Sequence, residues 1–144
     1  MRHVSLLSLA ALLLTSCSTT PTMPSAIFQT KAGPVSLNIE TADTAQERET
    51  GLMYRETMPE DQGMLFTFDD ERRLTFWMKN TLIPLDMVFL DHTKKVVHIA
   101  RDVQPCKADP CPLTPSMSAA KYVIETNAGW TANNGVSEGN LVEF

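Results

Sequence analysis

Two short segments of the chain hold residues that could recognise a ligand. The shorter one, GLMYR, covers residues 51 to 55 and ends in an arginine. The longer one, FWMKNTLIPLDMVFLD, covers residues 76 to 91 and places a lysine, an asparagine and a threonine between two apolar runs. An aromatic ring offers a stacking surface, and cationic side chains donate strong hydrogen bonds to anionic groups. With an acidic residue to orient the cations, the candidate ligand site consists of Arg55, Trp77, Lys79, Asn80, Thr81 and Asp86.

The expected geometry brings the cations next to the acidic residue. If residues 75 to 79 form a strand, Trp77 and Lys79 lie on the same face of it. Both faces carry large apolar side chains, so we expect the strand to be covered on both sides and Lys79 to be partly shielded from water. A shielded cation needs a partner, and we expect Asp86 to pair with Lys79 or with Arg55.

Two other interpretations fit the same residues. In the first, the protein is purely structural, with Asn80 and Thr81 bonded to backbone groups of a turn and Asp86 in an internal salt bridge. In the second, it is a hydrolase or lyase in which Asp86 is the general base and Lys79 or Arg55 stabilises developing negative charge. We assign no catalytic residue on this basis. The interpretation we favour is a ligand-binding or envelope accessory module.

Other kinds of chemistry have weaker support in the sequence. His92 and His98 do not form a metal pair, and no nucleophile, phosphate-loop or dinucleotide motif is present. Five methionines between residues 53 and 87 are more typical of core packing than of a copper site. Asp86 and Glu125 are a weak candidate for an acid and base pair, because they are far apart in sequence. We therefore expect no metal and no cofactor.

The first residues have the pattern of an export signal. A short basic start is followed by an apolar run from Val4 to Leu14, which is too short to span a bilayer. The sequence LTSC then resembles the lipobox of bacterial lipoproteins, in which Cys17 becomes the lipidated first residue. At 144 residues, the chain is long enough for one core. We predict a lipoprotein signal peptide at 1–16, a lipidated cysteine with a flexible tether at 17–26, and one globular domain at 27–144.

Lipidation determines where we expect the protein to lie. Several acyl chains anchor a domain stably, so the expected partner is a membrane, reached through the lipid on Cys17. Ser18 follows this cysteine where some sorted lipoproteins carry aspartate, and the resemblance favours the outer membrane, facing the periplasm. The alternative is a soluble periplasmic protein, cleaved between Ser18 and Ala26.

The acidic composition excludes one class of partner. The chain has 12 Lys and Arg residues against 17 Asp and Glu residues, a net charge of −5, and the mature form loses Arg2 as well. The charges are interspersed and form no basic stripe, so we expect no nucleic-acid partner. The expected ligand is a small anionic or sugar-like component of the cell envelope, and the sequence identifies no protein partner.

Cys106 and Cys111 remain once Cys17 is lipidated. An even pair in an oxidising compartment predicts a disulfide, and three prolines between residues 105 and 112 would make it the staple of a short rigid loop. A zinc site has less support because further ligands at the usual spacing are missing. A redox-active pair has less support because such pairs are spaced more closely.

The elements that position these residues are mostly strands. Alternation predicts strands at 35–40, 64–68, 74–79, 87–90, 96–100, 121–126 and 141–144, with a charged turn at 69–73. A capping-box pattern predicts a helix at 44–50, and a second short helical turn is expected at 128–134. The predicted fold is α+β: a mainly antiparallel sheet curled into a small barrel-like domain with one or two short helices.

Three segments together resemble a widespread prokaryotic family, the Domain of Unknown Function 192 family. They are GLMYRETMPEDQGMLFTF, FWMKNTLIPLDMVFLD and YVIETNAGW, and the resemblance covers about residues 35 to 144. It implies a small, mainly β domain that is often exported, and it implies no established activity. The signature residues of the family fall here on Gly51, Leu52, Met53, Arg55, Gly63, Met64, Phe66, Trp77, Met78, Lys79, Asn80, Thr81, Pro84, Leu85, Asp86 and Gly129.

Overall fold

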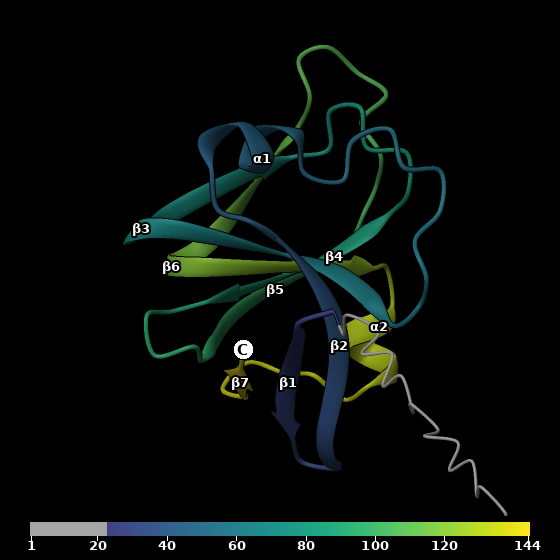
Figure 1. Ribbon diagram of the computed structural model, residues 1–144. Helices are drawn as coiled ribbons and strands as arrows, with labels where there is room; N and C mark the ends of the chain where they lie inside the picture. The colour runs from purple at the N-terminus through teal and green to yellow at the C-terminus, as the bar shows by residue number, and fades with distance from the viewer. Residues whose placement is uncertain (1–22) are drawn as a thin grey trace, which may run out of the picture.

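The computed structural model describes residues 23–144, so the signal peptide, Cys17 and most of the predicted tether lie outside the described residues. Figure 1 shows a single curled sheet with two short helices. Neither helix in the described part is long and apolar enough to cross a membrane. The elements are β1 (Ser25–Thr30), β2 (Gly33–Ala42), α1 (Ala45–Thr50), β3 (Gln62–Trp77), β4 (Leu85–Leu90), β5 (Val96–Val103), β6 (Leu113–Asn127), α2 (Trp130–Asn133) and β7 (Leu141–Glu143).

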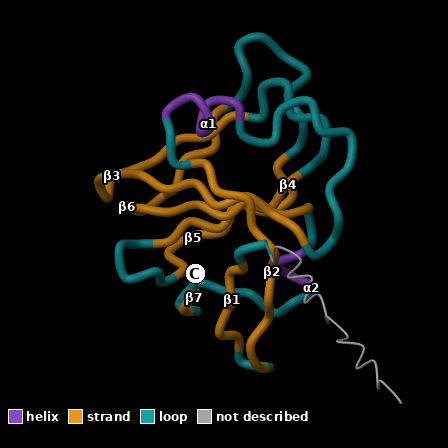
Figure 2. Tube along the Cα trace, viewed as in Figure 1, coloured by secondary structure: helices purple, strands orange, loops and turns teal. Residues whose placement is uncertain are grey.

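The sheet has the strand order β5-β4-β6-β3-β2-β1-β7 and curls into a half-barrel, as Figure 2 shows. Its pairs are antiparallel except for β2 and β3, which run parallel. The two edges meet at a bridge between Lys95 and Leu141. There the Val142 N–H donates to the Lys94 carbonyl at 3.0 Å. This confirms the predicted α+β class with a barrel-like, mainly antiparallel sheet.

Local sequence signals predicted most of the elements. The predicted helix at 44–50 forms as α1, and its capping box is present: Thr44 accepts from the Glu47 N–H, and Glu47 accepts from the Thr44 N–H. The strands predicted at 35–40, 87–90, 96–100 and 121–126 are all confirmed within longer strands. Strand β1 was not predicted. It begins at Ser25, inside the predicted tether.

The predicted charged turn at 69–73 is wrong. Strand β3 runs through it without a break from Gln62 to Trp77, and its register against β6 shifts between Thr67 and Arg72. Bulges of this kind bend a strand and let it leave the covered part of the sheet. Residues 69–73 are all exposed, so a run of charges there has water on its sides and does not need a turn.

Strands that follow one another along the chain are not always neighbours in the sheet. Strand β6 lies between β3 and β4, so the two strands that flank the motif FWMKNTLIPLD do not pair with each other. This insertion depends on long-range pairing, which local alternation does not report.

The sheet has an apolar core on each of its faces, and β4 between them is buried along its whole length. Side chains alternate along a strand, so Val88 and Leu90 enter one core while Met87 and Phe89 enter the other. We call the second the methionine core, because four of the five methionines in question help to form it. They are Met58, Met64, Met78 and Met87. This confirms that these thioethers fill space in the core.

Candidate ligand-binding site

Trp77 and Lys79 lie at the end of β3 and form an exposed cation and ring pair. The Trp77 side chain is 42% exposed, and the Lys79 Nζ lies 5.1 Å from the centre of its ring. The next residue on the other face, Met78, is buried in the methionine core. The expectation that both faces of this strand are covered is therefore wrong for the Trp77 face, which remains open to a ligand.

Asn80 is held by Tyr54 from the loop after α1. The Tyr54 N–H donates to the Asn80 carbonyl at 2.8 Å, and the Asn80 Nδ2 donates to the Tyr54 Oη at 2.9 Å. Both residues have a positive φ, of 64° for Tyr54 and 55° for Asn80. Asparagine tolerates this conformation, but for a bulky residue such as tyrosine it is strained. Strain of this kind concentrates where a fold holds functional groups in place.

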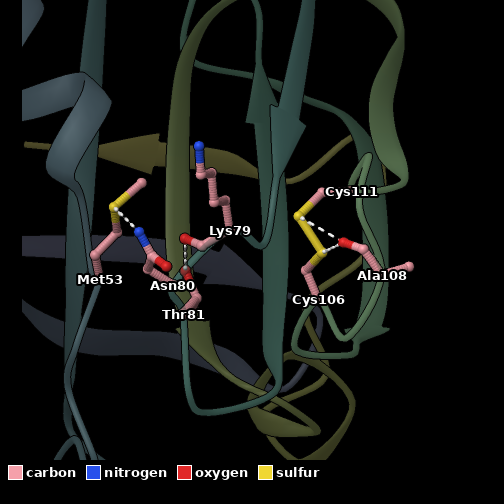
Figure 3. Close-up of a disulfide and its surroundings, with 7 residues drawn as sticks. All are labelled: Met53, Lys79, Asn80, Thr81, Cys106, Ala108 and Cys111. Carbon is pink, nitrogen blue, oxygen red and sulfur yellow. Dashed lines mark hydrogen bonds between the residues drawn. A yellow bond between two sulfur atoms is a disulfide. The ribbon is translucent and has the colours of Figure 1, made fainter.

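Thr81 closes the turn beside Asn80. It is buried, its N–H donates to the Met78 carbonyl at 3.2 Å, and its Oγ1 lies 3.5 Å from the Lys79 carbonyl. This matches the turn role that the structural interpretation gave it. Figure 3 shows residues 79–81 between Met53 on one side and the disulfide on the other.

The predicted disulfide between Cys106 and Cys111 forms and builds the opposite wall of a groove. The Cys106 N–H donates to the Met78 carbonyl at 3.3 Å, which fixes this loop to the end of β3. Between the loop and Trp77 lies a cavity of about 540 Å³. We call it the groove, and it is lined by Trp77, Lys79, Asn80, Cys106, Cys111, Leu113 and residues 108–110.

Asp86 does not join the cations of the groove. It is fully buried, and its Oδ1 accepts from the Asp102 N–H at 2.9 Å. Its Oδ2 accepts from the Thr131 N–H at 3.1 Å and from the Thr131 Oγ1 at 2.5 Å. Its neighbour Met87 enters the methionine core, so Asp86 points to the other face of the sheet. The expected contact of Asp86 with Lys79 or Arg55 is therefore wrong.

Arg55 has a different partner from the one expected. Its guanidinium forms a bidentate salt bridge with Glu40, in which Nη1 and Nη2 lie 2.5 Å and 2.7 Å from the two carboxylate oxygens. These bonds lower the pKa of Glu40 and raise the pKa of Arg55. Both side chains are about one-third exposed, at 32% and 38%, and neither lines the groove. Arg55 therefore joins the loop after α1 to β2.

Sequence reasoning did not place Glu125 in this site. Its side chain is almost fully buried, and burial raises its pKa to about 8. It lines a narrow slot of about 30 Å³ together with Trp77, Lys79, Thr81 and residues 48–53. Alternation offered a signal, because Val123 precedes Glu125 by two residues and both therefore point into the same apolar core.

The arrangement defines a small half-barrel domain with a ligand-sized groove at the end of its longest strand. The chain belongs to the DUF192 family, described as an uncharacterised ACR, which matches residues 26–144. No match to a curated protein is found.

Two solved structures resemble the chain. A suggested transcription regulator from Sinorhizobium meliloti 1021 is 35% identical, covers 87% of this chain and 97% of its own, and has a TM-score of 0.76. A protein of unknown function from Novosphingobium aromaticivorans DSM 12444 is 26% identical, covers 94% of this chain and 100% of its own, and has a TM-score of 0.80.

Proposed function

We propose that the protein binds a small anionic, sugar-like component of the cell envelope in the groove. The observation that carries this is the exposed Trp77 ring with the Lys79 Nζ 5.1 Å from its centre, on the wall of a cavity of about 540 Å³. The apolar face of a sugar ring stacks on an indole, and an ammonium pairs with a carboxylate or phosphate. The cavity volume of about 540 Å³ lies in the range of small-molecule sites.

Two other functions have less support. A hydrolase or lyase that uses Asp86 as its base needs this carboxylate at the substrate, but Asp86 is fully buried and accepts three hydrogen bonds on the opposite face of the sheet. The Sinorhizobium relative is described as a suggested transcription regulator, but a net charge of −5 opposes contact with nucleic acid in this chain.

We also propose that the domain is anchored by a lipid on Cys17 to the outer membrane and faces the periplasm. The LTSC sequence supports the anchor, and the disulfide of Cys106 and Cys111 supports an oxidising compartment. Replacing Cys17→Ser should abolish the incorporation of labelled palmitate into the protein. Labelling that persists in this variant would rule out this anchor.

Calorimetric titration with D-glucuronic acid tests the binding proposal. The titration uses the Cys17→Ser protein, which lacks the lipid site. Methyl glucoside, which has no charge, is the comparison ligand without a carboxylate. We expect Trp77→Ala and Lys79→Ala each to weaken glucuronate binding about tenfold or more. The matched control is Lys121→Ala, because Lys121 also lies beside a ring, 6.0 Å from Tyr122, but outside the groove.

The outcomes separate clearly. Binding that is weakened by changes at Trp77 and Lys79 but not at Lys121 supports the groove. If D-glucuronic acid does not bind, or if all three variants bind it as the parent protein does, the proposed function is wrong.

A further inference from the structure

Glu125 has no partner in the part of the chain that the structure describes. On β6 it lies opposite Met64 of β3 and Met87 of β4, which are both buried in the methionine core. Within residues 23–144, no hydrogen bond or ion pair reaches its carboxyl group, and the residue, which is 5% exposed, keeps a small opening at its unpaired oxygens. A buried carboxylate without a partner is costly, so the group is kept as the neutral acid, and its pKa is raised to about 8.

A buried polar group of this kind is expected to find a hydrogen-bond partner. The slot that Glu125 lines has a volume of about 30 Å³, and a water needs about 10–15 Å³ in the same measure. The slot therefore accepts one or two water-sized groups and excludes a whole sugar ring. A single ligand oxygen, or a water that bridges to it, fits this space.

The slot and the groove share two wall residues. Trp77 and Lys79 line both cavities, so a molecule held on this pair lies next to the slot that contains Glu125. The other charged residues of the slot are Arg48, which is half-buried, and Glu49, which is exposed, both on α1. Arg48 is engaged, because its Nη1 donates to the Asp43 and Thr67 carbonyls.

We infer that Glu125 is a ligand-binding residue of the groove: its carboxylic acid donates a hydrogen bond, through the slot, to an oxygen of the anionic molecule held on Trp77 and Lys79. This inference rests on the proposed function and adds a requirement for a ligand oxygen that accepts this bond. A neutral acid donates to such an oxygen, whereas the ionised carboxylate has no proton to donate and repels an anion. Binding should therefore require the protonated form of Glu125.

The test compares two replacements at this position in the Cys17→Ser protein. Glu125→Gln keeps a hydrogen-bond donor and has no charge at any pH, whereas Glu125→Leu has a similar size and no donor. D-glucuronic acid is titrated by calorimetry about 1.5 pH units below and above the Glu125 pKa of about 8. The carboxylate of this probe is ionised at both values. Thermal unfolding of each variant shows that it is folded.

We expect the parent protein to bind D-glucuronic acid about thirtyfold more weakly at the higher pH, because the protonated fraction of Glu125 falls about thirtyfold between the two values. We expect Glu125→Gln to show no such dependence, and Glu125→Leu to bind weakly at both values. If Glu125 has a purely structural role, Glu125→Leu should bind D-glucuronic acid as the parent protein does. An apolar side chain in an apolar core stabilises the fold and leaves binding intact.

Two contrary outcomes are distinguishable. If binding depends on Trp77 and Lys79 but is the same at both pH values and in Glu125→Leu, the proposed function holds and the inference about Glu125 is wrong. If the parent protein does not bind D-glucuronic acid at either pH, the proposed function fails and the inference fails with it.

Discussion

At the residue scale, the buried carboxyl of Glu125 makes the free energy of unfolding depend on pH. Folding raises its pKa from 4.5 to about 8, so between these values the folded chain keeps a proton that the unfolded chain releases. The free energy of unfolding is therefore not affected by Glu125 titration below pH 4.5, decreases as the pH rises from 4.5 towards 8, and no longer changes with Glu125 above that value. The slope is at most about 1.4 kcal/mol per pH unit.

Urea denaturation of the parent protein and of Glu125→Gln across this range measures the effect. The difference between the two isolates Glu125, since Glu40, whose pKa is lowered by Arg55, contributes a slope of opposite sign at acidic pH in both. We expect the parent to lose stability relative to the variant as the pH rises. Parallel curves would show that Glu125 is not buried as the structure has it.

Asp86 gives a second prediction at this scale. Its carboxylate accepts from the backbone of Asp102 and from both the backbone and the hydroxyl of Thr131. Replacing Asp86→Ala leaves the two buried donors of Thr131 and the part-buried N–H of Asp102 without a partner, and we expect a loss of about 3 kcal/mol or more. Amide hydrogen exchange should become faster at Asp102 and Thr131. Unchanged exchange at both positions would contradict this role.

The sequence located some site residues better than others for a physical reason. Trp77, Lys79 and Asn80 were placed together because they are consecutive or nearly so at the end of one strand, where position along the chain determines position in space. The partners of Asp86 lie on β5 and α2 and the partner of Arg55 lies on β2, and short sequence spacing does not report which elements meet.

At the element scale, Gly63 allows β3 to approach β6 closely. A Cβ added at this position would lie 2.5 Å from the Glu125 carbonyl oxygen and 2.9 Å from the Leu37 Cδ2. The first is a backbone atom in the middle of the sheet and cannot move away easily. We expect Gly63→Ala to cost about 3 kcal/mol or more in urea denaturation.

Gly135→Ala is the control for this change. A Cβ there meets nothing within 4 Å, but the residue has a φ of 66°, so the replacement introduces backbone strain alone. We expect it to cost about 1 kcal/mol. Equal losses at the two positions would mean that the close approach at Gly63 has no special energetic weight.

Elements differ in how far the sequence predicts them. The capping box of α1 lies within four consecutive residues, so Thr44 and Glu47 were enough to place the helix. The position of β6 between β3 and β4 depends on pairings such as Leu65 with Ile124, which are far apart in the chain. Local periodicity predicts that both segments are strands but does not say which strands are neighbours.

At the scale of the whole molecule, one end of the half-barrel closes the sheet and the other carries the groove. Figure 1 shows α1 at one end and β7 at the other. Near β7, the bridge of Lys95 and Leu141 joins the edges of the sheet, and Val142 is buried in the core beside it. The groove lies at the end of β3, between Trp77 and the disulfide loop. Stability and ligand binding should therefore respond separately to changes at the two ends.

Removing the disulfide tests this separation. Replacing Cys106→Ser and Cys111→Ser together opens a loop closed at a sequence separation of 5. We expect a loss of stability of about 2 kcal/mol from the freed loop. Because the loop is a wall of the groove, D-glucuronic acid should also bind more weakly. Val142→Ala, which creates a cavity near β7, should cost about 1–2 kcal/mol and leave binding to the folded protein unchanged. If Val142→Ala weakens binding as much as loss of the disulfide does, the two ends are not independent, and binding reports stability rather than the shape of the groove.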